Sequence, residues 1–452
     1  MTTTSEGPTA GQEENARAGS VEAADQERLT EAAAQEAALA VDPSLVANSI
    51  GEYMRAWWKR VRGGDTGVLP IVVGLVAIVV IFQVQNSLFL SSGNITNLLV
   101  QASVFVLFGM AEVFVLLLGE IDLSVGYVAG VGAVVVALLV GPVGLPWIVA
   151  VLAGLAITTA VGALQGTLVT RLHLPSFVVT LSGLLFFEGA MIWMVNTFSP
   201  TTGGVITVTN PVIADLVNGN MTAIEGWITL LIVFVVYAAI TVRRESRRRR
   251  QGLTAPPAQL TLIRLAMVLV AGVLLVLIFN STRGPGAGFS GLPPVIPGIL
   301  VVLVAFTFLL SSTRFGRYVY AIGGNAEAAR RAGVNLALTR TAAFALSGFT
   351  AGLAGIVYES RLESISTDID GGTYVLYAVA AAVIGGASLF GGRGKPVHAL
   401  LGGVVIAAIY NGMGLLGLAA AIQYMVTALV LLAALTVDRV ARRGRAFRSA
   451  DG

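Results

Sequence analysis

The chain has 452 residues, of which 56% are hydrophobic and only 12% are charged, and its mean hydropathy is +0.83. Soluble domains carry roughly 25% charged residues, so this composition excludes a soluble globular protein and indicates an integral membrane protein. The sequence contains no cysteine and two histidines, which excludes thiolate and histidine-rich metal centres, and we expect no metal site. The net charge of +3 has to be judged by where the charges lie, and we expect no nucleic-acid partner.

Residues 1–64 are unlike the rest of the chain. The first 50 residues hold nine acidic residues among Ala, Thr, Gln and Gly, and so polar a segment cannot bury a hydrophobic core. We predict a cytoplasmic, largely disordered tail that ends in a basic membrane flank, with Trp57 and Trp58 as an interfacial anchor. The tail is not a signal peptide, because the first apolar run begins only at Val68 and follows that basic flank.

Twelve apolar runs between residues 65 and 440 are candidates to cross about 30 Å of hydrocarbon. They are Val68–Val84, Ile95–Leu118, Val125–Val140, Pro146–Thr170, Ser176–Val195, Trp227–Val242, Thr261–Phe279, Val295–Ser311, Leu338–Tyr358, Tyr374–Phe390, His398–Leu416 and Ala421–Val437. The predicted fold is therefore an all-α, polytopic transmembrane helical bundle of 10–12 spans. Several runs are short or interrupted by Gly and Pro, so we expect one or two to be broken or re-entrant.

The basic residues predict the orientation of this bundle. If the N-terminus is cytoplasmic, all of the 28 Lys and Arg residues except Arg283 and Arg361 fall on the cytoplasmic side, as the positive-inside bias requires. We therefore expect a multi-pass protein with both termini in the cytoplasm. Residues 441–452 form its basic cytoplasmic tail.

Three connecting segments are long enough to carry structure or contacts. Arg243–Gln259, with six arginines before two prolines, is predicted to be a cytoplasmic linker. Asn196–Gly226 and Glu359–Thr373 lie outside in this topology. Their polar and charged residues suit either docking of a soluble partner or simple solvation.

The loop between the eighth and ninth runs contains the segment Thr313–Asn335, which combines a turn, a cap and a stop. Asn325 follows two glycines and can accept a hydrogen bond from an amide two or three residues later, and Glu327 then stands at the positive end of the helix. Gly333 supplies a left-handed stop. We predict a short cytoplasmic helix, Ala326–Ala332, that a partner can push; an ordinary capped interfacial helix is the alternative.

Four motifs along the chain carry a resemblance to a known family. They are Leu118–Gly126 (LGEIDLSVG), Leu174–Leu181 (LPSFVVTL), Arg314–Asn335 and Val383–Lys395 (VIGGASLFGGRGK). With these motifs in order, residues 65–440 resemble the permease subunits of bacterial ABC importers for monosaccharides, of the ribose and xylose type. Glu120 in the first motif, and the additional hydrophobic hairpin around residues 243–279, are more similar to the xylose permeases.

The resemblance implies a function and a set of partners. The function is translocation of a monosaccharide, D-xylose or a related pentose, with ribose and galactose as alternatives, across the bacterial inner membrane. The partners are a second permease chain in a homodimer, a cytoplasmic ABC ATPase and a periplasmic sugar-binding protein, with the lipid bilayer around them. The residues that match the family's ATPase-coupling loop, at 324–333, are Gly324, Asn325, Ala326, Glu327, Ala328, Arg330 and Gly333.

The energy source is expected to lie on a partner. A P-loop needs a glycine-rich turn that ends in Gly-Lys-Ser or Gly-Lys-Thr, whereas Gly394-Lys395 is followed by Pro396 and lacks the earlier glycine. We expect ATP and Mg²⁺ to be bound by the ATPase subunit and no cofactor to be bound by this chain. We also expect no catalytic residue, so that the chain is a transport subunit and not an enzyme.

A second class of function is an ion-coupled secondary transporter, which needs ionisable groups within the bilayer. Glu112 and Glu188 are the candidates, and each can equally be a neutral, hydrogen-bonded structural group. Neither has a histidine or arginine in an adjacent span, so the two make a poor relay. A third class, a membrane enzyme, needs a convergent acid, base and nucleophile set that the sequence does not present.

A sugar path favours neutral hydrogen-bonding and aromatic side chains that face inward. The candidates for the path are Glu112, Gln165, Phe177, Thr180, Ser182, Glu188, Asn196, Tyr374, Tyr377 and Asn411. Interhelical hydrogen bonding or core packing is the alternative for each. The motif residues Glu120, Asp122 and Ser124 belong to the family pattern, and on physical grounds Asp122 and Ser124 are interpreted as the N-cap of the third span. Glycine-rich breaks at 119–126 and 385–394 lie at comparable places in the two halves, as in a weak internal repeat.

Overall fold

The computed structural model describes residues 50–62, 67–198, 203–252, 256–281, 290–430, 432 and 436. Most of the N-terminal tail predicted at residues 1–64, the tail predicted at residues 441–452, and the end of the last predicted span lie outside the described residues. The chain divides into two compact units, one of Met1–Asp65 with Phe234–Leu269 and one of Thr66–Val233 with Val270–Gly452. The second unit is the larger and holds the candidate site.

Eight helices of the described residues are long and apolar enough to cross a membrane. They are α5 (Ser92–Leu116), α7 (Trp147–Arg171), α8 (Ser176–Phe198), α10 (Ala223–Arg250), α11 (Ala258–Asn280), α12 (Val295–Ser312), α15 (Leu336–Leu362) and α17 (Pro396–Leu415). Shorter apolar helices are α4 (Leu69–Gln85), α6 (Val125–Val140), α16 (Gly371–Ile384) and Ala420–Val430. Together these helices coincide with the twelve predicted runs, so the prediction of an all-α, polytopic membrane bundle is confirmed.

The shortest of these helices show where the bundle is interrupted. α16 has 14 residues, which at 1.5 Å per residue cover about 21 Å and leave the helix short of the hydrocarbon thickness. α6 has 16 residues and follows a non-helical break after α5. The Gly and Pro residues of the predicted apolar runs indicated that some of the spans would be short or broken, and α6 and α16 are such helices.

The smaller unit corrects one prediction from the sequence. Arg243–Arg250 is not a linker but the end of α10, which runs for 28 residues. Arginine is a good helix former, and the basic residues in the last turn complement the negative end of the helix. The Thr261 hydroxyl on α11 donates to the Glu245 carboxylate on α10, which ties the two helices together. The same unit contains the helix α3 (Ile50–Arg62).

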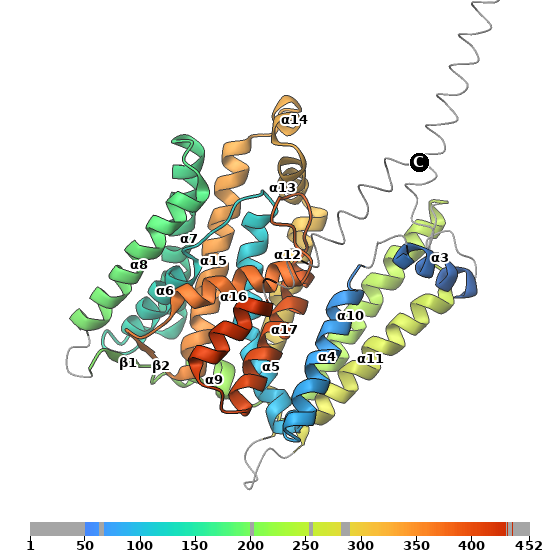
Figure 1. Cartoon of the computed structure of the whole chain (residues 1–452), viewed down its shortest axis with the longest axis horizontal. Coiled ribbons are helices and arrows are strands. Elements are labelled where there is room, and N and C mark those ends of the chain that lie inside the picture. The colour runs from blue at the N-terminus through green and yellow to red at the C-terminus, as the bar shows by residue number, and fades with distance from the viewer. Residues whose placement is uncertain are drawn as a thin grey trace, which may run out of the picture. The chain divides into compact units, whose positions relative to one another are not determined.

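The core of the larger unit is built around α5 (Figure 1). Of its most apolar 18-residue stretch, 94% is buried, and α5 packs against α15, α16, α17 and α12. α15 also lies against α7 and α6, where glycines allow the backbones to meet. A Cβ on Gly162 would overlap the Phe344 carbonyl, and one on Gly355 would overlap the Ala129 carbonyl. Such close contact gains van der Waals attraction between helices in lipid, where no hydrophobic force drives them together.

The two loops predicted to lie outside are joined to each other. β1 (Val205–Thr207) pairs antiparallel with β2 (Ser364–Ser366), and α9 (Pro211–Asn218) follows β1. The Asn218 side chain donates to the Ser360 carbonyl at 2.9 Å. In the larger unit β1, β2 and α9 lie at one end of the helices, and α13 and α14 lie at the other (Figure 1); we call these the ribbon end and the α14 end.

At the ribbon end, the surroundings of Glu359 differ from those predicted from the sequence. The sequence placed Glu359 in an outside loop whose charges suit either docking of a partner or solvation, but α15 continues to Leu362 and the Glu359 side chain is 0% exposed. Neither of its carboxylate oxygens has a hydrogen-bond partner among the described residues. The sequence could not show this, because the helix continues past the last strongly apolar residue of the run.

Candidate functional site

Two short helices, α13 (Arg314–Gly324) and α14 (Ala326–Arg331), connect α12 to α15. Thr313 is the N-cap of α13, and its hydroxyl accepts a hydrogen bond from the Gly316 amide at 3.3 Å. One face of α13 buries Val319 and Ile322, which are 0% and 3% exposed. The helix is therefore amphipathic and lies against the bundle with its charged face outward.

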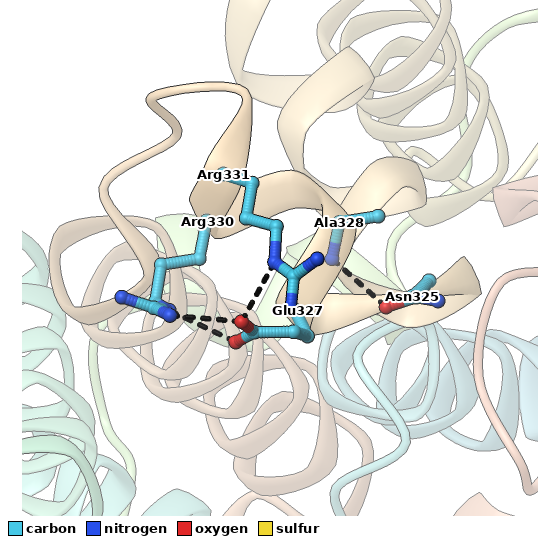
Figure 2. Close-up of polar contacts among 5 residues, drawn as sticks. All are labelled: Asn325, Glu327, Ala328, Arg330 and Arg331. Atoms are coloured by element: carbon cyan, nitrogen blue, oxygen red, sulfur yellow. Dashed lines mark hydrogen bonds and ion pairs between the residues drawn. The ribbon is translucent and has the colours of Figure 1, made fainter.

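α14 has the caps that the sequence predicts (Figure 2). The Asn325 side-chain oxygen accepts a hydrogen bond from the Ala328 amide at 2.9 Å, which satisfies one of the free donors at a helix start. The helix ends at Arg331, with Ala332 as the C-cap and Gly333 at a φ of +83°. Only glycine adopts that left-handed conformation without steric cost. The predicted capped helix is confirmed, one residue shorter than expected.

The charged residues of α14 are paired with each other. Arg330 donates from Nε and Nη2 to the two Glu327 carboxylate oxygens at 2.9 Å and 2.8 Å, and Arg331 Nε donates to Glu327 at 3.0 Å (Figure 2). These hydrogen bonds lower the pKa of Glu327 to about 2. The three side chains remain 50% to 76% exposed, so α14 presents a fixed, solvent-facing group of charges.

The C-terminal end of α13 rests on two loops that contain glycines. A Cβ on Gly323 would overlap the Leu117 carbonyl oxygen, and the Gly392 amide donates to that same oxygen at 2.9 Å. The Tyr320 hydroxyl donates to the Gly394 carbonyl at 2.6 Å, and burial raises the pKa of Tyr320. We call the contact between residues 117–119, Gly323 and residues 391–394 the glycine junction.

The glycine junction brings together the two glycine-rich breaks that the sequence shows. Gly119 and Gly391 both have a positive φ, +78° and +84°, and a Cβ on Gly391 would lie 3.0 Å from the Gly119 amide nitrogen and from the Gly323 carbonyl oxygen. The break after α5 and the loop before α17 therefore meet directly beneath α13. α13 therefore contacts both segments.

A buried polar network follows the break after α5. Asp122 accepts hydrogen bonds from the Ser124 amide at 3.0 Å and the Ser124 hydroxyl at 2.7 Å, and from the Ser347 hydroxyl at 3.2 Å. The Gln165 side-chain amide donates to the Ser124 hydroxyl at 2.8 Å. All four side chains are at most 5% exposed. The network joins α6, α7 and α15.

The structure differs in one respect from the prediction that Asp122 and Ser124 form the N-cap of the third span, which is α6. Ser124 occupies the cap position of α6, but its side chain makes no capping hydrogen bond. A capping serine needs an extended backbone, whereas Ser124 has a ψ of −12° and donates its hydroxyl proton to Asp122. The Asp122 carboxylate instead takes the amide hydrogen bond that turns the chain into α6.

Glu120, the first acidic residue of the motif, faces α15. Its carboxylate lies 3.7 Å from Arg340 Nε, and both residues line a cavity of about 430 Å³ between α7, α8 and α15. Arg340 lies in α15, five residues after Asn335, the N-cap of that helix. The segment from α13 to the start of α15 therefore contacts the Leu118–Gly126 motif in two places, at the glycine junction and at this ion pair.

Comparison with known proteins identifies the family. A family model described as "Branched-chain amino acid transport system / permease component" matches residues 94–435. The chain belongs to this permease family. The match covers most of the chain and includes the break after α5, the helices α13 and α14, and the loop before α17.

Individual relatives agree with the family. The xylose transport system permease protein of Escherichia coli strain K12 is 31% identical over 377 residues, which are 83% of this chain and 92% of that protein. The xylose transport system permease protein of Haemophilus influenzae is 35% identical over 82% of this chain and 96% of that protein. The ribose import permease protein of Escherichia coli strain K12 is 29% identical over 80% and 92%. No solved structure matches the chain.

The residues predicted to line the path of this permease fall into separate groups. Gln165 and Thr180 are buried near the break, and the Thr180 hydroxyl donates to the Ser176 carbonyl at 2.9 Å. Phe177 and Ser182 are exposed on α8, and Asn196 is exposed at the end of that helix. The structure therefore does not assemble the predicted residues into one site within a single chain.

The other path residues lie nearer the ribbon end. Tyr374 and Tyr377 belong to a cluster of aromatic rings, with centroids 6.2 Å apart. Asn411 on α17 accepts a hydrogen bond from the Asn94 side chain on α5 at 2.8 Å, which is the interhelical bonding given as the alternative for such residues.

The two carboxylates of the ion-coupled alternative are not connected to each other by any hydrogen bond between described residues. Glu112 is 0% exposed, lacks a hydrogen-bond partner among the described residues, and lies beside Asp122. Glu188 on α8 is half-buried against Tyr127 of α6. Sequence analysis did not identify Tyr127, Tyr320, Arg340 or Ser347 as members of these groups, because each contact joins elements far apart in the chain.

Proposed function

We propose that this permease is the membrane subunit of an ATP-driven importer for a monosaccharide, D-xylose or a related pentose. The names of the relatives, which are permeases of xylose, ribose and allose systems, support a sugar as substrate. The observation that carries the mechanism is the capped, charged helix α14 seated through α13 on the glycine junction. A transporter that works as a single chain does not need a rigid, solvent-exposed helix for a partner to displace, whereas a subunit moved by a partner does.

The proposed assembly is a homodimer of permease chains in the inner membrane, with an ABC ATPase in the cytoplasm and a periplasmic sugar-binding protein. The α14 end is cytoplasmic, the ribbon end is periplasmic, and both termini are cytoplasmic. The ATPase subunit holds ATP and Mg²⁺. This chain contributes no cofactor site and no catalytic residue, and it contacts lipid but no nucleic acid.

The proposed mechanism follows the contacts from α14 inward. Closure of the ATPase displaces α14, and α13 moves with it because only Asn325 separates the two helices. At the glycine junction that motion shifts the break after α5 and the loop before α17. Through Asn335 it also moves the start of α15, which carries Arg340 and Ser347, so the buried network around Asp122 changes with it.

Transport by a reconstituted complex tests the function. Proteoliposomes that contain the permease and the ATPase, with ATP inside and the binding protein outside, are expected to accumulate labelled D-xylose. Ribose and galactose, assayed with their own binding proteins, test the alternative sugars. Accumulation by the permease alone under a pH gradient would instead support ion-coupled secondary transport.

A charge reversal on α14 tests the coupling role. Glu327→Lys places a third cation beside Arg330 and Arg331, so we expect loss of ATP-driven uptake and reduced co-purification of the ATPase while the bundle stays folded. Glu363→Lys at the ribbon end is the matched control and is expected to retain the ATPase. Undiminished co-purification by Glu327→Lys contradicts the assignment of α14.

A further inference from the structure

Six aromatic rings form one cluster on four helices near the ribbon end. Neighbouring ring centroids lie 5.1 Å to 5.7 Å apart for Tyr358–Tyr374, Phe105–Tyr377, Phe108–Tyr374 and Phe105–Tyr410. The rings come from α5, from the last turns of α15, from the start of α16 and from α17. α15 ends, and α16 begins, next to β2.

A cation lies within this cluster without an ionic partner. The Arg361 guanidinium is half-buried and close to Tyr358, Tyr374 and Tyr410, and it donates a long hydrogen bond of 3.5 Å to the Asn97 side chain. No ion pair joins Arg361 to another of the described residues. A guanidinium that is partly removed from water and lacks strong acceptors is energetically unfavourable, so its presence needs a reason.

Acceptor groups stand at the edge of the same cluster. Asp370, the cap of α16, accepts hydrogen bonds from the Thr373 amide at 3.0 Å and from the Tyr424 hydroxyl at 3.1 Å, and it is exposed. The Gln101 side-chain oxygen on α5 is buried and has no hydrogen-bond partner among the described residues. Donors and acceptors are thus both available beside the rings.

An interfacial aromatic belt does not account for this arrangement. Belt residues direct their rings toward lipid headgroups, whereas Phe105 and Tyr377 are 3% and 4% exposed and the rings pack on each other. Tyr410, at 36% exposure, and the exposed Asn97 and Asp370 mark the side from which the cluster is accessible. Behind Tyr358 and Tyr374 the remaining cavity is only about 10 Å³, too small for anything but water.

The chemistry of the cluster matches a neutral monosaccharide. A sugar ring presents C–H groups that pack on the electron-rich faces of aromatic rings, and its hydroxyls both donate and accept hydrogen bonds. Tyrosine supplies a rigid face and a hydroxyl at low entropic cost. The Arg361 guanidinium donates and the Asp370 carboxylate accepts hydrogen bonds, so the two serve sugar hydroxyls of both roles, and the negative charge of Asp370 disfavours an anionic sugar.

We infer that Tyr358, Tyr374, Tyr410, Arg361, Asp370 and Asn97 form an acceptor site that receives the monosaccharide at the ribbon end. The inference rests on the proposed function and adds to it a place of first contact on the permease. Tyr410, Asn97 and Asp370 are exposed, so we expect the site to hold the sugar weakly and to release it readily. Tyr358, Tyr410, Arg361, Asp370 and Asn97 were not among the path residues predicted from the sequence.

The test uses the reconstituted complex with saturating, sugar-loaded binding protein. Arg361→Gln is expected to lower D-xylose uptake about tenfold, the size of effect that follows from the loss of a hydrogen bond to a charged group. Tyr374→Leu is expected to lower uptake as well, because it removes an aromatic face and a hydroxyl. Stimulation of the ATPase by the loaded binding protein is expected to persist in Tyr374→Leu, because this substitution leaves α14 and the exposed charges of the ribbon end, where the binding protein is proposed to dock, unchanged. Tyr237→Leu on α10, outside the cluster, is the matched control.

A direct binding measurement separates contact from folding. Saturation-transfer NMR of the solubilised complex is expected to show D-xylose in contact with the unaltered permease, and that signal is expected to be lost in Arg361→Gln. Glucuronate is expected to give none. Normal uptake and signal in both variants, or preference for glucuronate, overturns the inference while transport by the unaltered complex still stands. Absence of all sugar transport by the unaltered complex refutes the proposed function itself.

Discussion

At the scale of single residues, the α14 element depends on a few side chains with distinct tasks. A helix of six residues is too short to persist alone, so Asn325 at its start and Gly333 at its end determine whether it forms. Glu327 then holds Arg330 and Arg331 in one geometry. Exposed ion pairs add little stability, so the pairing matters chiefly for the shape that a partner meets.

The cap of α14 can be tested by a matched pair of substitutions. Asn325→Ala removes the acceptor for the Ala328 amide and is expected to cost about 1 kcal/mol of local stability. Asn325→Asp keeps an acceptor and is expected to behave like the original chain. Hydrogen exchange at the α14 amides should accelerate in Asn325→Ala alone, together with lower ATP-driven uptake; equal exchange in both variants would show that the cap is not needed.

The ionisation of Glu327 makes a prediction for pH. Its pKa is lowered from 4.5 to about 2 by hydrogen bonds from Arg330 and Arg331, so the pairing is complete above 4.5 and is lost as the pH falls toward 2. From about pH 5 to 8 we therefore expect no inflection in the hydrogen exchange of α14 due to this carboxyl. Glu327→Gln, which lacks the charge, is expected to give faster exchange throughout that range, and an inflection near neutral pH in the unaltered chain would contradict the pairing.

At the scale of elements, the glycine junction is the contact through which, in the proposed mechanism, a displacement of α14 and α13 reaches the helical bundle. α13 contacts the break after α5 and the loop before α17 by backbone groups, without intervening flexible side chains. A backbone contact transmits displacement with little slack, because packed elements have discrete arrangements rather than continuous freedom. The close contact on which the proposed coupling rests depends on the absence of a Cβ at Gly323.

Two neighbouring glycines provide the test of this contact. Gly323→Ala places a Cβ against the Leu117 carbonyl, while Gly324→Ala meets nothing within 4 Å. Overpacking of this kind costs about 1 to 3 kcal/mol, so the thermal stability of the purified permease is expected to fall for Gly323→Ala and to stay nearly unchanged for Gly324→Ala. An equal effect of the two substitutions would mean that the junction is not tightly packed.

At the scale of the whole molecule, the larger unit has two structurally different ends. The helices α13 and α14 lie at one end, and β1, β2 and α9 lie at the other (Figure 1). This separation suits the proposed transporter, which is driven from one side and loaded from the other. The buried network around Asp122 joins helices between the two ends.

The orientation of these ends can be measured directly because the chain contains no cysteine. In intact cells, a membrane-impermeant maleimide is expected to label Glu363→Cys at the ribbon end and not Arg331→Cys on α14. Permeabilised cells should show labelling of both, which serves as the control for reactivity. The reverse pattern in intact cells would place α14 outside and remove the basis for coupling to a cytoplasmic ATPase.

The sequence by itself determined the features that depend on neighbouring residues. Long apolar runs identify the spans, because a helix must satisfy its own backbone in lipid. The cap and stop of α14 lie within nine residues, Asn325 to Gly333, and need no distant partner. The motifs also predicted the family correctly.

Only the tertiary structure decided the contacts between segments far apart in the chain. Leu117 meets Gly323 and Gly392, Asp122 meets Ser347, and β1 pairs with β2, and no local pattern specifies such pairs. Burial of Glu359 and the position of Arg361 among tyrosines likewise depend on how the end of α15 packs against α5 and the start of α16. Sequence periodicity reports which face of a helix is apolar, whereas close packing in three dimensions determines which helix that face meets.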